Sequence, residues 1–208
     1  MKVFVRSLKI IGIIFFTGVI LAGLFWGVRN YQILKDVHQY DNQVAELTQA
    51  KELEEYQRLV SAIIMTESKG QGVDLMQSSE SAYGEIEQIT SQKESLTQGI
   101  SYLSQALELA DAAGCDVWTA VQAYNFGLDY IDYVKEHGQK NTIKLAQTYS
   151  KEVLAPILGN SELNQYRYWN PHAVAYNGGY LYQNGGNFFY AQIVKNNQEK
   201  LKITEFLF

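Results

Sequence analysis

The most informative stretch of the sequence is Ala62-Ile63-Ile64-Met65-Thr66-Glu67-Ser68-Lys69-Gly70-Gln71-Gly72-Val73-Asp74-Leu75-Met76-Gln77-Ser78-Ser79-Glu80-Ser81. Apolar residues at helical spacing lead up to Glu67, and Gly70 and Gly72 predict where this helix ends. Asp74 follows Glu67 by seven residues, in a loop rich in amides and hydroxyls. The stretch therefore predicts a carboxyl group at the boundary between an apolar core and a polar surface.

Glu67 has the sequence surroundings of a general acid. Burial beside Ile63 and Ile64 disfavours the carboxylate, as does the negative end of a helix dipole, so both raise the pKa. A carboxyl group that stays protonated near neutral pH can protonate the leaving oxygen of a glycosidic bond. Asp74 could orient a water molecule, stabilise the transition state or attack the sugar. The pattern alone leaves alternatives open: Glu67 as an exposed last-turn residue, and Asp74 as a loop cap.

Further helices are predicted downstream, so the fold class is mainly α. One helix runs from Thr97 to Gly114, and the next is capped by Asp116 and ends at Gly127. Shorter helices are predicted at residues 130–137 and 143–154, the latter stopped by Pro156 and Gly159, whereas residues 78–98 are predicted as a loop or short helix. The apolar residues that support the two longer helices are Ile100, Leu103, Leu107, Ala110, Val117, Ala120, Val121 and Tyr124.

The C-terminal part, residues 166–208, differs in composition. Tyr, Asn and Gly dominate it, and Gly178-Gly179 and Gly185-Gly186 predict turns. Residues 188–194 fit a strand or a short helix equally well, so residues 143–154 form the last helix that the pattern defines. We expect the aromatic residues between Tyr166 and Tyr190 either to line a binding cleft or to close the core.

The N-terminal residues predict a membrane anchor. Residues 1–9 are basic, and residues 10–28 form an uncharged apolar run that can cross a bilayer core of roughly 30 Å as a helix. Basic residues stay in the cytoplasm, which places the remainder outside the cell. A cleaved signal peptide, which would release the domain, is the alternative, but Ala22-Gly23 is a poor cleavage site, and no cysteine follows it to support a lipoprotein anchor. The amphipathic residues 29–44 are predicted as a stalk or as the first helix of the domain.

Composition excludes several other classes of protein. The net charge of −5 provides no basic surface for nucleic acid. Cys115 is the only cysteine, which rules out an internal disulfide and argues against a structural zinc site. We expect this residue to be a small buried apolar group. The 15 Tyr and 3 Trp residues are compatible with carbohydrate binding but equally with core packing.

Three short motifs resemble those of one group of enzymes. Glu67-Ser68-Lys69-Gly70 is similar to the Glu-Ser-x-Gly motif of soluble lytic transglycosylases and goose-type lysozymes, and Leu75-Met76-Gln77 to the end of their Gly-Leu-Met-Gln segment. Ala123-Tyr124-Asn125-Phe126-Gly127 is similar to their Ala-Tyr-Asn-x-Gly helix end. The order is the same, and the resemblance covers roughly residues 45–160. The shorter loop after Glu67 and the aspartate at position 74 in place of glycine resemble CwlT-type lysozyme-like muramidases.

The resemblance implies a lysozyme-like helical domain over residues 45–208, which cleaves the MurNAc–GlcNAc bond of peptidoglycan. It assigns the general acid to Glu67 and an assisting role to Asp74. The residues that it implies for glycan binding are Gln77, Tyr124 and Asn125, and Ser79 is close enough in sequence to contribute, with a helix N-cap as its alternative role. No cofactor or protein partner is implied. A lytic transglycosylase that forms anhydro products and a non-catalytic peptidoglycan-binding or scaffolding protein are the alternatives.

Overall fold

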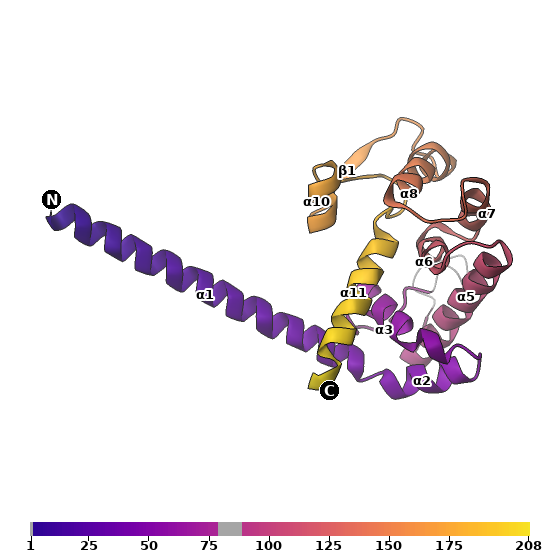
Figure 1. Ribbon diagram of the computed structural model, residues 1–208, viewed down its shortest axis with the longest axis horizontal. Helices are drawn as coiled ribbons and strands as arrows, with labels where there is room; N and C mark the ends of the chain where they lie inside the picture. Colours follow the sequence, from indigo (N-terminus) through magenta and orange to yellow (C-terminus); the bar gives the residue numbers. More distant parts are fainter. Residues whose placement is uncertain (1, 79–88) are drawn as a thin grey trace.

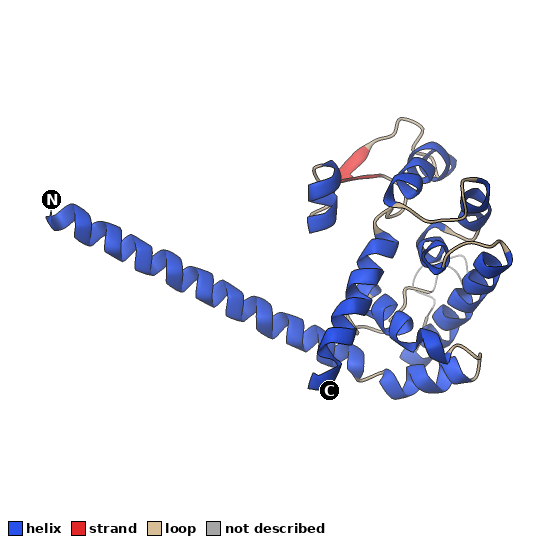
Figure 2. Cartoon of the chain, viewed as in Figure 1, coloured by secondary structure: helices blue, strands red, loops and turns tan. Residues whose placement is uncertain are grey.

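The computed structural model describes residues 2–78 and 89–208, with side chains described from residue 12 onward. A long helix leads into a helical domain with one small two-stranded sheet (Figures 1 and 2). The elements are α1 (Lys2–His38), α2 (Asp41–Gln49), η1 (Glu54–Tyr56), α3 (Gln57–Glu67), α5 (Gln92–Ala112), α6 (Val117–Phe126), α7 (Asp129–Glu136), α8 (Ile143–Tyr149), the π-helical η2 (Ser150–Leu154), α9 (Ala155–Ile157), β1 (Gln165–Arg167), α10 (Pro171–Asn177), β2 (Tyr180–Tyr182), α11 (Tyr190–Thr204) and η3 (Glu205–Leu207). The mainly α fold class is confirmed.

Helix α1 joins the predicted membrane anchor to the domain without a break. It includes an apolar window with a mean hydropathy of 1.8 that makes no buried contact with the domain, and its length suffices to cross a membrane. The side chains of Leu34 and Val37, 4% and 1% exposed, are already part of the domain core. The segment 29–44 therefore supplies the first core residues of the domain, because its apolar stripe packs on α3.

Helix α3 lies at the centre of the domain. Every residue from Leu59 to Met65 is buried, because α11, α2 and the end of α1 cover it from different sides (Figure 1). Gly70, in the left-handed conformation at φ +76°, ends the segment where a Cβ atom would lie 2.5 Å from the backbone of Asp36. This close approach to α1 requires glycine and confirms that the helix stops at the predicted place.

The predicted start of the next helix was too late. Helix α5 begins at Gln92, not at Thr97, so the end of the predicted loop is helical. Ser91 caps the helix by accepting a hydrogen bond from the backbone N–H of Glu94, while the Glu94 carboxylate accepts one from the backbone N–H of Thr90. This arrangement resembles a capping box, and its sequence pattern, Ser-x-x-Glu, was present in the chain. Residues 79–88 of the same predicted loop lie outside the described part.

The predicted ends of α6 are confirmed. Asp116 caps α6 by accepting a hydrogen bond from the backbone N–H of Thr119 (3.0 Å), and Gly127 follows the helix at φ +92°. The helix predicted at residues 143–154 forms as α8 and η2, but the prediction that Pro156 stops it was wrong, because α9 continues through Pro156 to Ile157. Proline is accepted there because it stands near the start of α9, where its missing N–H costs little.

The C-terminal part holds a long helix that the sequence did not define. Strands β1 and β2 pair antiparallel, with Tyr166 opposite Leu181, and α10 fills the connection between them. Helix α11 then runs from Tyr190 to Thr204 along α3. The sequence left residues 188–194 open between strand and helix, and packing of Tyr190, Val194 and Leu201 against the core decides for the helix.

Candidate functional site

Glu67 is the last residue of α3, and its half-buried carboxyl group faces the start of α11. The hydroxyl group of Tyr190 donates a hydrogen bond of 2.6 Å to Glu67 Oε1. Burial raises the pKa of Glu67 to about 7; the hydrogen bond from Tyr190 opposes this rise, and the nearby charge of Asp74 adds to it. The carboxyl group therefore titrates near neutral pH, well above the ordinary range of a glutamate.

Two tyrosine rings form the immediate surroundings of this acid. The rings of Tyr124 on α6 and Tyr190 on α11 are stacked, with centroids 6.3 Å apart and planes 8° from parallel. The hydroxyl group of Tyr124 donates to the backbone carbonyl of Met76 (3.0 Å). Burial, and then the charges of Glu67 and other neighbours, raise the pKa of both phenols well above the ordinary value. Both side chains are thus neutral hydrogen-bond donors at physiological pH.

A close approach between α5 and the loop after α3 holds the hydroxyl group of Tyr124 in place. A Cβ atom on Gly99 would lie 2.6 Å from Met76 Cβ and Sδ and 2.9 Å from the hydroxyl oxygen of Tyr124. Met76 is fully buried. Glycine at position 99 therefore lets α5 approach the Met76 backbone that holds Tyr124.

Asp74 is built into the loop that follows α3. Its Oδ1 atom accepts hydrogen bonds from Ser95 Oγ (2.7 Å) on α5 and from the backbone N–H of Ser78 (2.9 Å). Ser95 Oγ in turn accepts from the backbone N–H of Met76 (3.0 Å). Asp74 therefore caps the loop, which is one of its two predicted roles. Its charge also raises the pKa of both Glu67 and Tyr124. A catalytic role of Asp74 stays a prediction.

The other predicted site residues occupy different positions around this centre. Gln77 is exposed, has a left-handed backbone at φ +49°, and donates to the backbone carbonyl of Asp74 (3.1 Å). Asn125, also exposed, accepts a hydrogen bond from the backbone N–H of Asn187 (2.7 Å) through Oδ1. It therefore braces the loop that precedes α11. Ser79 lies outside the described residues.

Helix α11 is bonded to α3 at Glu67 and also at the residue next to it. Asn197 Nδ2 donates to Thr66 Oγ1 (2.9 Å), one residue before Glu67, and Gln122 on α6 accepts from the backbone N–H of Ala191 (3.1 Å). Three helices thus meet at the acid from different parts of the chain. The described residues include no group of three or more His, Cys, Asp or Glu side chains placed to hold a metal ion.

Tyr190 is the functional contact that the sequence reasoning missed. It stands 123 residues after Glu67, so no local spacing connects the two. Helix α11 starts after Phe189, which makes no side-chain capping hydrogen bond, so no cap in the sequence marks where this helix begins.

Cys115 differs from the expected buried position. It is partly buried and packs against the edge of the core, with Sγ 4.0 Å from the backbone carbonyl oxygen of Ile131. Burial is also the largest cause of its raised pKa, so the thiol is protonated at neutral pH.

Comparisons with known proteins agree with this geometry. Pneumococcal vaccine antigen A of Streptococcus pneumoniae is 43% identical over 182 residues, which cover 86% of this chain and 89% of that protein. A homologue from Streptococcus pyogenes serotype M1 is 53% identical over 139 residues, 67% of this chain and 69% of that protein. The bifunctional muramidase/DL-endopeptidase CwlT of Bacillus subtilis is 42% identical over 93 residues, 45% of this chain but only 27% of its own length.

A solved structure extends the similarity to the fold. The crystal structure of a lipoprotein-like protein of the NLP/P60 family from Staphylococcus aureus matches with a TM-score of 0.71 and 33% identity. The match covers 79% of this chain and 52% of that chain, so this chain spans about half of the larger protein. The lysozyme-like family model matches residues 34–198, which begin at the first buried residue of α1 and include the acid and both tyrosines. The chain therefore belongs to the lysozyme-like family.

Proposed function

We propose that this protein is a membrane-anchored muramidase that cleaves the MurNAc–GlcNAc bond of peptidoglycan, with Glu67 as the general acid. The observation that carries the proposal is the carboxyl group of Glu67, half-buried, hydrogen-bonded to Tyr190 and with a pKa of about 7. Such a group exists in both protonation states near neutral pH, so it can give a proton to the leaving oxygen and later accept one from water. Membership of the lysozyme-like family and the similarity to a muramidase support the same reaction.

The hydrogen bond from Tyr190 directs the proton of the acid. A phenol that donates to Oε1 occupies that oxygen, so the proton of the neutral carboxyl group resides on Oε2. The bond also stabilises the carboxylate that forms when the proton leaves, which limits the rise in pKa caused by burial. Tyr190 therefore sets both the position and the acidity of the transferred proton.

Asp74 assists in this proposal through its charge. Cleavage of a glycosidic bond passes through an oxocarbenium-like transition state, which carries positive charge on the sugar. The charge of Asp74 raises the pKa of Glu67, which favours the protonated acid at the start of the reaction. Water is the acceptor in this scheme. A lytic transglycosylase, in which a hydroxyl group of the sugar attacks, would require no second acid.

Sugar-binding roles are proposed for exposed polar groups near the acid. Gln77 and Asn125 present amides at the surface, and amide groups can bind the N-acetyl groups of the glycan. Tyr124 contributes through its ring, since its hydroxyl group is already bonded to Met76. Ser79 is retained as a proposed contact on the resemblance alone.

The membrane anchor forms part of the proposal. Helix α1 is apolar and exposed over residues 12–28, and a relative of the chain, YocA of Bacillus subtilis, 37% identical over 120 residues, is named as an uncharacterized membrane protein. Basic residues precede the span, so the lysozyme-like domain would face the cell wall outside the membrane.

Digestion of purified peptidoglycan tests the reaction. The detergent-solubilised full chain, Glu67→Gln and the matched control Glu136→Gln, at an exposed position on α7, are incubated with peptidoglycan, and the products are analysed by mass spectrometry. We expect reducing ends from the native chain and from Glu136→Gln, and none from Glu67→Gln. Anhydro ends would establish the transglycosylase instead. Absence of products from the native chain, together with retained binding to peptidoglycan, would establish a non-catalytic binding protein.

A further inference from the structure

The C-terminal turn of the domain exposes a group of apolar side chains. Ile203 and Phe206 are 68% and 83% exposed, and Leu207 and Phe208 are also exposed. They follow Leu201, the last buried residue of α11, at the end of that helix and in the short 3-10 helix η3. Apolar residues grouped in this way on a surface usually mark an interaction site. We call residues 203–208 the C-terminal turn.

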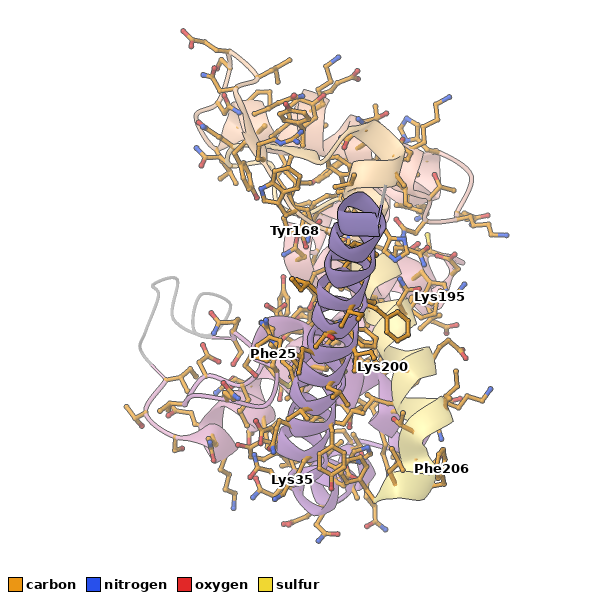
Figure 3. All side chains as sticks on the ribbon, turned by 90° about the vertical axis from the view of Figure 1, so that its left-hand side faces the viewer. Phe25, Lys35, Tyr168, Lys195, Lys200 and Phe206 are labelled. Atoms are coloured by element: carbon orange, nitrogen blue, oxygen red, sulfur yellow. The ribbon has the colours of Figure 1, made fainter. Side chains whose placement is uncertain are left out.

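The C-terminal turn is fixed to the part of α1 that leaves the proposed membrane span. The ring of Phe208 stacks on Tyr31, with centroids 5.7 Å apart, and on His38 at 4.4 Å. Lys200, one turn before the C-terminal turn, donates a hydrogen bond to the side chain of Asn30. Figure 3 views the domain from the side on which α1 leaves it, and Phe206 and Lys200 lie on this face of α11.

Helix geometry places the contacts with Asn30 and Tyr31 at the level of the lipid headgroups. Tyr31 is three residues beyond Val28, the end of the apolar run, which corresponds to a rise of about 4.5 Å along the helix axis. The interfacial region of a bilayer is about 5–8 Å thick on each side of the hydrocarbon core. Side chains of a helix also point toward its N-terminus, here toward the bilayer. His38, the other residue on which Phe208 stacks, is ten residues beyond Val28, which corresponds to a rise of about 15 Å, so the ring of Phe208 lies at the outer edge of the interfacial region.

The charges near the C-terminal turn fit a phospholipid surface. Lys200 and Lys202 on α11 directly precede the C-terminal turn, and Lys35 lies on the part of α1 that it contacts; basic side chains are attracted to anionic headgroups. Of the acidic residues in the same segment, Glu205 forms an ion pair with Arg58 (3.0 Å), and Glu199 is exposed. Aromatic residues combined with lysine are typical of the interface between water and lipid.

We propose that the C-terminal turn contacts the headgroups of the same membrane that α1 crosses. The inference rests on the proposed membrane anchor. The domain is then attached at two points, through the continuous helix α1 and through the end of α11. Because the start of α11 carries Tyr190, this attachment orients the hydrogen-bonded pair of Tyr190 and Glu67 relative to the membrane surface. The enzyme would thus act on glycan strands at a fixed height and orientation.

Spin labels on the full chain test this inference. In a Cys115→Ala background, single nitroxide labels are attached at Phe206→Cys, at Ile20→Cys in the proposed span and at Glu136→Cys on α7. The chain is reconstituted in vesicles of phosphatidylglycerol and phosphatidylethanolamine, and the accessibility of each label to oxygen and to a water-soluble nickel chelate is measured. Position 206 is exposed and makes the substitution compatible with folding.

The three labels separate the possible outcomes. We expect the label at position 206 to be several-fold less accessible to the nickel chelate than the label at position 136, and the label at position 20 to be accessible only to oxygen. Equal chelate accessibility at 206 and 136, with position 20 shielded, would overturn the docking but leave the anchor intact. A chelate-accessible label at position 20 would refute the anchor and the docking together. Spin–spin broadening at position 206 that persists on dilution in lipid would assign the surface to a second copy of the chain.

Discussion

Replacement of Glu67 by glutamine should stabilise the protein at pH 8 more than at pH 5. The pKa of Glu67 is about 7 in the folded state against an ordinary value of 4.5. Between these two values the folded protein binds a proton that the unfolded chain releases, so the free energy of unfolding falls as pH rises through this window. Glutamine carries no titrating group at this position, which removes this loss.

The expected difference follows from the two pKa values. A rise of one pKa unit corresponds to about 1.4 kcal/mol, so the native glutamate costs about 1 kcal/mol at pH 5 and about 3 kcal/mol at pH 8, an upper limit because the carboxyl group is only half-buried. The stability that Glu67→Gln gains over the native chain is thus larger at pH 8 than at pH 5 by about 2 kcal/mol. For a domain of this size, the increase in melting temperature caused by Glu67→Gln should be larger at pH 8 than at pH 5 by about 4–8 °C.

Thermal unfolding of the detergent-solubilised chains, followed by near-ultraviolet circular dichroism at pH 5 and pH 8, measures this effect. Glu67→Gln also alters the hydrogen bond with Tyr190, but this effect on stability is the same at both pH values and cancels in the comparison. Glu136→Gln, at an exposed position on α7, serves as the matched control and should show the same pH dependence as the native chain. If Glu67→Gln also follows the native pH dependence, the carboxyl group has no raised pKa, and the case for a general acid at this position fails.

Three further substitutions test the surroundings of the acid. Tyr190→Phe removes a hydrogen bond that favours the carboxylate of Glu67, so the pKa of Glu67 should rise. The alkaline limb of the pH–activity profile should therefore move to higher pH by about one unit. An alkaline limb that stays in place or moves to lower pH would contradict the role of Glu67 as the general acid. Gly99→Ala should cost about 1–3 kcal/mol of stability and most of the activity, because its Cβ would overlap Met76, whereas Gln105→Ala on the exposed face of α5 should leave both unchanged. Asn125→Ala should cost about 1 kcal/mol in thermal unfolding, because the backbone N–H of Asn187 loses its acceptor, and Asn125→Asp, which keeps an acceptor, should not.

The parts of the fold that local signals determine could be predicted from the sequence. Asp116 and Gly127 bound α6 because an aspartate cap and a left-handed glycine act within a few residues of the helix ends. Gly70 ends the segment after α3 for the same reason. Glu67 itself was identifiable because apolar residues precede it and glycine follows it, a pattern that predicts both burial and a helix terminus.

The parts that depend on tertiary contacts could not be predicted in the same way. Residues 188–194 have a composition that suits strand or helix, and the packing of α11 on α3 decides between them. The amphipathic pattern of residues 29–44 predicted a helix, but the pattern could not show that this helix packs on α3. The double contact of Asp74 with Ser95 and Ser78 likewise depends on how α5 meets the loop.

The raised pKa of Glu67 depends both on local sequence signals and on tertiary contacts. A carboxyl group at a helix end would ordinarily face water, and the apolar residues before it cannot bury it alone. Its burial requires α11, which covers α3 and brings Tyr190 within 2.6 Å of Oε1. Helix α11 therefore acts on the pKa of Glu67 in two opposite directions. Its packing buries the carboxyl group and raises the pKa, and the hydrogen bond from Tyr190 limits this rise. The result is a pKa near neutrality, which neither full burial nor full exposure of a glutamate would give. A chain that loses α11 should therefore lose the acid–base function of Glu67 even with α3 intact.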